Sequence, residues 1–170
     1  SNKIEAYNLP QGVISHMYRD IAAHNIGTIT HVGLYTFADP RNGGGKLNDV
    51  TKEDLVKVVE IEGQERLLYK AFPINVVFLR ASYADEYGNC TVHREIGPID
   101  VTAMAQACKN SGGRVIVQVE KIVQGGSLDP KLVAIPGIYV DSIVVGSIED
   151  NEQCLGMPYD GSLTGEFRIP

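Results

Sequence analysis

Five consecutive residues, Asn8-Leu9-Pro10-Gln11-Gly12, combine groups that can handle an anionic ligand. Proline favours the first turn of a helix, where free backbone N–H groups attract anions. The Gln11 amide can donate a hydrogen bond to a carboxylate or an oxyanion, and Gly12 lets a ligand approach the backbone. From the residues alone, an ordinary capped helix with an exposed glutamine is the favoured interpretation.

A glycine-rich segment resembles a phosphate-binding loop but lacks two of the residues that such a loop requires. Gly43-Gly44-Gly45-Lys46 would need Gly at position 40 and Ser or Thr at position 47 to cradle phosphate and bind magnesium. Those positions hold Pro40 and Leu47. We therefore interpret residues 39–48 as an irregular, flexible loop rather than a nucleotide site. The GxGxxG dinucleotide pattern and the GxSxG hydrolase pattern are also absent from the sequence.

Glu86-Tyr87-Gly88 could be read as a catalytic glutamate before a glycine turn. Asp85, Gly88 and Asn89 are all turn formers, so a tight turn is the stronger interpretation.

Metal chemistry has no support either. The three cysteines lack a CxxC pair and the four histidines lack metal-ligand spacing, so we expect buried or half-buried thiols in a reducing compartment.

The composition excludes several classes of protein. A chain of 170 residues with 44% hydrophobic and 21% charged residues has the size and composition of one globular domain. A net charge of -6, with dispersed basic residues, argues against nucleic-acid binding. The most apolar stretch, residues 133–148, is interrupted and too short to span a bilayer, and no secretory signal is visible. We therefore expect a cytoplasmic protein.

Ser1-Asn2 reads like a cloning scar and the far end resembles a linker, so we expect a piece of a longer polypeptide.

Hydrophobic periodicity predicts strands that alternate with helices. Such alternation indicates an α/β fold with an open, mainly parallel sheet flanked by helices, and with a small β-hairpin insertion. Three nearly continuous apolar runs are expected to be neighbouring strands of that sheet, buried on both faces. The predicted helices cover residues 8–25, 51–57 (capped by Thr51 and Asp54) and 98–109, and the predicted strands cover 28–34, 58–61 and 66–69 (the hairpin), 76–79, 90–94, 115–119 and 142–145.

Longer segments of the chain resemble the family I CoA-transferases, in particular the fused acetate, propionate and 3-oxoacid type. They cover most of the chain in the family's order, and they match the latter part of its first, alpha-type half. The closing YDGSLTGEFRIP (159–170) resembles the connector between the two halves. The other segments are EAYNLPQGVI (5–14), GLYTFADPRNGGGKLN (33–48), YKAFPINVVFLRASYADEYGN (69–89), KNSGGRVIVQVEKI (109–122), GSLDP (126–130) and VAIPGIYVDSIVV (133–145).

The resemblance implies a CoA-transferase-like fold, related to sugar-phosphate isomerase folds. It implies that residues 1–150 are the latter part of the alpha-type domain and that residues 151–170 are an extended connector. It also implies an enzyme that moves CoA between a short-chain acyl-CoA and a carboxylic acid through a glutamyl-CoA thioester. Such enzymes serve short-chain fatty acid and ketone body or 3-oxoacid metabolism. Coenzyme A is then a substrate, and no permanently bound cofactor is expected.

Two parts of the family's catalytic machinery are not found in this sequence. The nucleophilic glutamate belongs to the beta-type half in a Glu-x-Gly-x-x-Gly pattern, which Glu86 fails because position 91 is Thr. A glycine-rich oxyanion loop would precede Lys3. We therefore expect an inactive fragment whose partners are its missing N-terminal segment and the beta-type half, within a homo-oligomer that binds neither nucleic acid nor membrane.

By resemblance, the glutamine of the Pro-Gln-Gly motif faces the nucleophilic glutamate. Gln11 is therefore the expected supporting catalytic residue, and Gly12, Gly33 and Thr36 are expected to bind substrate. The last two lie at or just beyond the carboxyl end of the strand predicted over residues 28–34, and ligands of open α/β sheets gather beyond the carboxyl ends of strands. Two alternatives stay open, namely a sugar-phosphate isomerase-like enzyme and a non-catalytic domain that binds CoA or a partner subunit.

Overall fold

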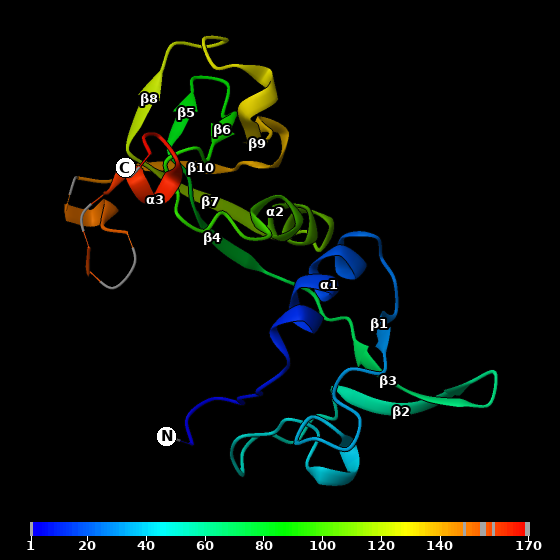
Figure 1. Ribbon diagram of the computed structural model, residues 1–170. Helices are drawn as coiled ribbons and strands as arrows, with labels where there is room; N and C mark the ends of the chain where they lie inside the picture. Colours follow the sequence, from blue (N-terminus) through cyan, green and yellow to red (C-terminus); the bar gives the residue numbers. More distant parts are fainter. Residues whose placement is uncertain (1, 148, 154–155, 158, 169–170) are drawn as a thin grey trace. The chain divides into compact units, whose positions relative to one another are not determined.

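The computed structural model describes residues 2–147, 149–153, 156–157 and 159–168 (Figure 1). Ser1, Ile148 and Cys154, which the sequence arguments include, lie outside these ranges. The chain divides into two compact units, Ser1–Pro73 and Ile74–Pro170. The expected division at residue 150 concerns the parts of a larger enzyme and stays a prediction. Among the described helices, none combines the length and the apolar character needed to cross a membrane.

The first unit packs helix α1 (Gln11–Ala22) beside an antiparallel sheet of order β1-β3-β2. Helix α1 buries Val13, Met17 and Ile21 at helical spacing, as predicted, and Pro10 is its N-cap rather than a first-turn residue. Tyr69 is fully buried in the same core. The strands are β1 (Gly27–Thr30), β2 (Val56–Ile61) and β3 (Gln64–Lys70), and a one-turn 3-10 helix, η1, covers Pro40–Asn42.

The predicted β-hairpin is confirmed, because β2 pairs with β3 in antiparallel register from Val56↔Tyr69 to Ile61↔Gln64. Glu62 and Gly63 connect the strands with φ angles of 49° and 73°. Positive φ at both central residues is the geometry of the type I′ turn, which is favoured in two-residue hairpins. The Glu62-Gly63 pair therefore forms the hairpin turn that the sequence suggested.

Two local predictions in the first unit are wrong. The strand expected over residues 28–34 ends at Thr30, and the chain then turns, with the Leu34 N–H donating to the His31 carbonyl at 3.2 Å. The helix expected over 51–57 does not form. The Thr51 hydroxyl instead contacts Ala6 and Asn48, while Asp54 pairs with Lys46 at 2.6 Å. With its capping groups engaged elsewhere, the β-branched segment that follows joins strand β2.

The second unit contains a parallel sheet of order β10-β7-β4, in which Phe78 pairs with Ile116, and Ile116 with Ser142. A second sheet has the order β8-β5-β6-β9. Helix α2 (Val101–Asn110) packs against β4, β7 and β9. The strands are β4 (Val76–Arg80), β5 (Tyr83–Asp85), β6 (Cys90–Thr91), β7 (Arg114–Val119), β8 (Lys121–Val123), β9 (Val133–Ile135) and β10 (Ser142–Val145).

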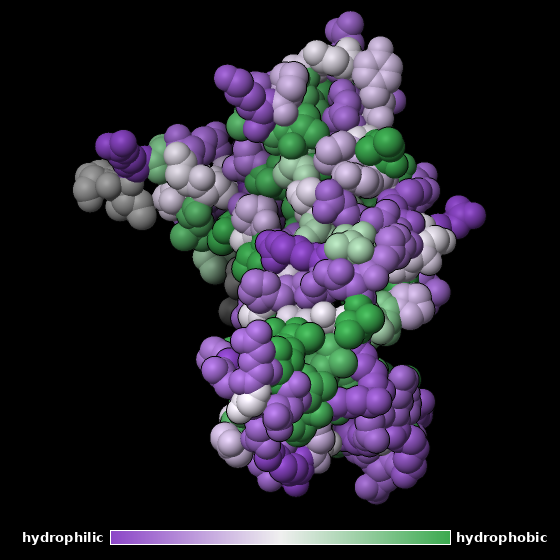
Figure 2. Space-filling view, turned by 90° about the vertical axis from the view of Figure 1, so that its right-hand side faces the viewer, coloured by the Kyte–Doolittle hydropathy of each residue, from purple (hydrophilic) through white to green (hydrophobic). Residues whose placement is uncertain are grey.

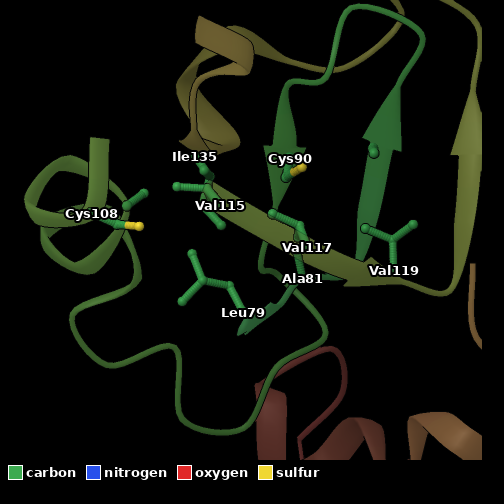
Figure 3. Packing of buried hydrophobic residues seen from close by; sticks show 10 residues of the cluster. Leu79, Ala81, Cys90, Cys108, Val115, Val117, Val119 and Ile135 are labelled. Atoms are coloured by element: carbon green, nitrogen blue, oxygen red, sulfur yellow. The ribbon is translucent and has the colours of Figure 1, made fainter. Parts of the chain in front are cut away.

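The core of the second unit lies between α2 and the sheets (Figure 3). Alternate residues of β7, namely Val115, Val117 and Val119, are fully buried there, together with Cys108 of α2 and Ile135 of β9. Helix α2 begins three residues later than predicted and ends at Asn110, before the glycine pair that was expected to stop it. The strand expected over residues 90–94 is limited to β6.

The parallel arrangement of the three apolar strands is confirmed, but their predicted burial on both faces is wrong. In β4, Phe78 is 77% exposed and Val76 is 47% exposed, and in β10, Val144 and Val145 are about half exposed. Figure 2 shows hydrophobic residues that reach the surface among hydrophilic ones on one face of the molecule. The α/β class is confirmed. The other two sheets also contain antiparallel strand pairs, such as β1 with β3 and β5 with β6.

Residues 149–168 contain a 3-10 turn, η4 (Glu149–Asn151), and a short helix, α3 (Gly161–Thr164). Arg94 holds part of this segment: its guanidinium lies 3.6 Å from the Tyr159 ring centroid and 3.3 Å from the Glu166 carboxylate. Two further 3-10 turns, η2 (Pro130–Leu132) and η3 (Gly137–Tyr139), flank β9. That residues 151–170 lead toward a second half stays a prediction.

Candidate active site

Helix α1 places Gln11 and Gly12 in its first turn, where both are exposed. The N–H groups of Val13 and Ile14 donate to the Pro10 carbonyl at 2.9 and 3.1 Å. Within the described ranges, the N–H groups of Gln11 and Gly12 meet no backbone acceptor. A Cβ added at Gly12 would have no atom within 4 Å. The helix start thus offers two N–H groups and one amide to an incoming anion.

The glycine loop fixes the position of this helix start. The Asn8 N–H donates to the Gly45 carbonyl at 2.8 Å, and the Gly45 N–H donates to the Phe37 carbonyl at 2.9 Å. Gly45 has a φ of +76°, and a Cβ there would lie 2.6 Å from the Asn8 carbonyl oxygen. Residues 39–48 form an irregular loop, as expected, and within it Gly45 supports the segment that leads into α1. The run of glycines at residues 43–45 was the only sequence signal for the contact between Gly45 and Asn8.

Gly33 and Thr36 lie in the turn that follows β1. Gly33 has a φ of +97°, and a Cβ there would lie 2.2 Å from the Tyr69 hydroxyl oxygen, so packing alone requires glycine. The Thr36 hydroxyl donates to the Gly33 carbonyl at 2.8 Å, which uses its single proton inside the turn. Both residues therefore have structural roles, and their expected contact with substrate stays a prediction.

Gly45 links the helix start that carries Gln11 to the turn that carries Gly33 and Thr36. Its carbonyl holds Asn8, next to the helix start, and its N–H holds Phe37, next to Thr36. Among the side-chain hydrogen bonds of the described residues, none joins Gln11 to Thr36 directly. The helix start and the 33–37 turn are thus neighbours by way of one glycine.

A buried carboxylate, Asp39, stabilises the same region and was missed by the sequence arguments. Its side chain is fully buried and accepts hydrogen bonds from the Tyr35 N–H at 2.8 Å, the Arg41 N–H at 3.0 Å and the Arg41 guanidinium at 2.7 and 2.9 Å. Hydrogen bonding by that guanidinium holds the pKa of Asp39 well below its usual range. Arg41 also reaches Glu65 of β3 at 3.2 Å.

Comparison with known proteins identifies the family. Residues 1–146 match the family model described as Coenzyme A transferase. The chain belongs to the CoA-transferases. It is 45% identical over 168 residues to the acetate CoA-transferase YdiF of Escherichia coli, with 99% of this chain and 32% of that protein covered.

Two further relatives and one solved structure define the match. The chain is 49% identical to the caffeate CoA-transferase of Acetobacterium woodii, covering 100% of this chain and 33% of that protein. It is 32% identical to one of the subunits of the 3-oxoadipate CoA-transferase of Pseudomonas putida, covering 86% of this chain and 55% of that one. The crystal structure of the acyl-CoA transferase YdiF from E. coli O157:H7, a thioester complex with CoA, superimposes with a TM-score of 0.92 over 99% of this chain and 34% of that one. The chain thus spans about a third of the length of YdiF and of the caffeate enzyme, and it corresponds to the alpha-type region of family I.

In this CoA-transferase chain, Glu86 is part of a turn, as predicted. The buried Asp85 carboxylate accepts the N–H groups of Tyr87 and Asn89 at 3.0 and 2.9 Å. The Glu86 carboxylate accepts the Gly125 N–H at 2.9 Å. Glu86 therefore joins two loops of the second unit rather than presenting a free nucleophile.

The described thiols and acids of the CoA-transferase chain do not form a metal site. Cys90 and Cys108 are buried and free, and burial raises the pKa of both thiols, that of Cys90 to about 12. In the part of the chain that the structure describes, no three His, Cys, Asp or Glu side chains are grouped to hold an ion.

Proposed function

We propose that this chain is the latter part of the alpha-type half of an acyl-CoA:carboxylate CoA-transferase. The enzyme moves CoA between a short-chain acyl-CoA and a carboxylic acid. The observation that carries the proposal is the placement of the family's Pro-Gln-Gly motif at an exposed helix start, with Gln11 available to a ligand. Coenzyme A is the substrate, and the enzyme needs no permanently bound cofactor.

The reaction divides one difficult exchange into chemically similar steps. A glutamate carboxylate outside this chain attacks the thioester carbonyl, and the CoA thiolate leaves as an acyl-glutamyl anhydride forms. The thiolate then attacks the glutamyl carbonyl of the anhydride, which releases the free carboxylic acid and leaves a glutamyl-CoA thioester. An acceptor carboxylate runs the same steps backwards. Each step passes through an oxyanion that a preorganised N–H donor stabilises.

Gln11 supports this chemistry as a hydrogen-bond donor. Its amide is the side chain best placed to hold the nucleophilic carboxylate or a developing oxyanion, because it is exposed and belongs to a helix whose start is fixed by Gly45. Gly12 leaves room for the ligand beside the backbone. We place Gly33 and Thr36 at the edge of the same substrate site.

The partners of this chain are the preceding alpha-type segment and the beta-type half, assembled into a homo-oligomer in the cytoplasm. We assign the enzyme to short-chain fatty acid or 3-oxoacid and ketone body metabolism. The connector 151–170 leads toward the beta-type half.

Acyl transfer from acetyl-CoA to a second carboxylate tests the proposal. The 170-residue chain alone should be inactive, and the complete enzyme, with the beta-type half and the preceding segment, should be active. Gln11→Ala should lower kcat of the complete enzyme roughly 10- to 1000-fold, as expected for the loss of one oxyanion donor. Gln124→Ala, a second exposed glutamine, is the matched control and should leave kcat unchanged.

Four outcomes would contradict the proposal. Transfer by the chain alone would show that the nucleophile is inside it. An unchanged kcat for Gln11→Ala would reduce the Pro-Gln-Gly motif to a helix start. A complete enzyme that binds CoA without transferring it would favour the non-catalytic alternative, and isomerisation of a sugar phosphate would favour the other.

A further inference from the structure

Tyr35 adopts a backbone conformation that bulky residues avoid. Its φ is +64°, two residues after Gly33 at +97°. A non-glycine residue in the left-handed region stays there only where its surroundings hold it, and such residues cluster at ligand clamps and active sites. What holds Tyr35, and what the turn presents, therefore indicate what the turn does.

Side chains on both sides of the turn hold its backbone. The Asp39 carboxylate accepts the Tyr35 N–H at 2.8 Å. The Asn42 amide donates to the carbonyls of both Tyr35 and Thr36, at 3.2 and 3.1 Å. The Tyr69 hydroxyl adds a hydrogen bond to the Val32 carbonyl at 2.9 Å. The turn is thus fixed at both backbone groups of Tyr35 and at its two flanks, which is more than a connecting loop requires.

The turn presents two aromatic rings to solvent. Tyr35 is 72% exposed and Phe37 is 51% exposed, whereas the Thr36 hydroxyl is occupied inside the turn. The Tyr35 ring is held by its hydroxyl, which donates to Glu65 at 3.1 Å, and by the Arg41 guanidinium, 5.0 Å from the ring centroid. A rigid aromatic surface suits contact with a flat or apolar group of a ligand rather than hydrogen bonding.

We propose that residues 35–37 form a preformed contact turn for acyl-CoA, and that Asp39 and Asn42 are its positioning residues. The inference rests on the proposed function, because it takes acyl-CoA as the ligand. The Gly45 link places this turn beside the segment that leads into Gln11. Aromatic contact by Tyr35 and Phe37 then complements the hydrogen bonding that Gln11 supplies.

Asn42→Ala in the complete enzyme is the main test. Asn42 is exposed, so the variant should fold, and its loss should release the carbonyls of the turn. We expect the KM for acetyl-CoA to rise about 10-fold with kcat within about twofold, because small misplacements of a contact surface are felt strongly. Asn48→Ala is the matched control, since the Asn48 amide donates to the Ile4 carbonyl in the same loop without touching the turn. It should leave KM unchanged.

Tyr35→Gly separates the ring from the backbone. Glycine adopts a φ near +64° without strain, so the turn should persist while the aromatic surface is lost. KM should rise as for Asn42→Ala. Comparing acetyl-CoA with butyryl-CoA then shows which part of the ligand is touched: a KM effect that grows with the acyl chain indicates the acyl group, and an equal effect indicates the CoA moiety.

The inference is overturned if both variants keep the wild-type KM, or if kcat falls while KM stays constant. If the wild-type enzyme shows no transferase activity, the proposed function is refuted. A binding measurement then still tests this inference separately. Calorimetric titration with butyryl-CoA, which carries both the acyl group and the CoA moiety, should then show weaker binding to Asn42→Ala than to wild type. Equal affinity, or no binding to either protein, would overturn the contact turn.

Discussion

Replacing Gly45 by alanine should destabilise the fold by more than the backbone strain of the substitution alone. At a φ of +76°, a non-glycine residue costs about 1–2 kcal/mol. The added methyl group would also lie 2.6 Å from the Asn8 carbonyl oxygen and 3.1 Å from Leu9 Cδ2. A backbone oxygen cannot rotate away, so the segment before α1 must shift, and such overpacking costs about 1–3 kcal/mol. We expect a total loss of about 2–5 kcal/mol in the free energy of unfolding.

Gly63→Ala is the matched control for this prediction. Gly63 has a φ of +73°, and a Cβ there would have no atom within 4 Å. It should lose only the strain of about 1–2 kcal/mol. Urea denaturation of the 170-residue chain, followed by circular dichroism, measures both losses under identical conditions. If Gly45→Ala is no less stable than Gly63→Ala, the glycine loop does not position the helix start.

Three further predictions concern single side chains. Gln11→Ala should change the melting temperature very little, because the side chain is exposed at the helix start and surface substitutions stay within about 0.5 kcal/mol; a large drop in thermal melting would show a folding role. Asp39→Asn should lower the free energy of unfolding at pH 7 by about 2 kcal/mol. Since the folded-state pKa of Asp39 is depressed, its contribution is present above the unfolded-state pKa of about 4 and is lost as pH falls below it. Urea melts at pH 7 and pH 3 should therefore show a smaller deficit at pH 3, and an equal deficit at both would exclude the charge as its cause. Phe78→Ser should reduce self-association of the isolated chain in sedimentation, because Phe78 is 77% exposed on an apolar sheet face. The control Ile4→Ser, at a 71% exposed site in the other unit, should not reduce it. A strictly monomeric wild-type protein would contradict this prediction.

Local rules were sufficient where a segment carries its own instructions. The helix over α1 followed from apolar residues at helical spacing and a proline at its start. The hairpin followed from Glu62-Gly63 between two apolar runs, and the turn at Glu86 followed from its turn formers. In each case the decisive contacts lie within a few residues along the chain.

Local rules failed where the partner is distant in the sequence. The segment 28–34 has the β-branched residues of a strand, but Gly33 approaches the Tyr69 hydroxyl, which comes from strand β3. Thr51 has the type of a helix cap, yet its hydroxyl contacts Ala6. A single sequence does not reveal such pairings.

The burial of the parallel strands failed for a different reason. An apolar run shows what a strand tends to bury, whereas its burial depends on what packs against it. Among the described strands of the β10-β7-β4 sheet, only the central strand β7 has a neighbour on each side, and its alternate valines are fully buried. The exposed face around Phe78 and Val144 is consistent with the proposal that further segments of a longer enzyme pack against this sheet.

Three carboxylates of the first unit are engaged in other contacts, which is consistent with the proposal that the nucleophile comes from elsewhere. A nucleophilic carboxylate must be free to attack a thioester. Glu5 accepts the Lys52 N–H at 2.9 Å, and Asp39 is buried and bound by Arg41. Glu65 is paired with the same arginine. Gln11, in contrast, is exposed and lies in a fixed first turn. In the proposed enzyme, this chain would supply a hydrogen-bond donor and a contact surface, and a catalytic glutamate from the beta-type half would complete the site.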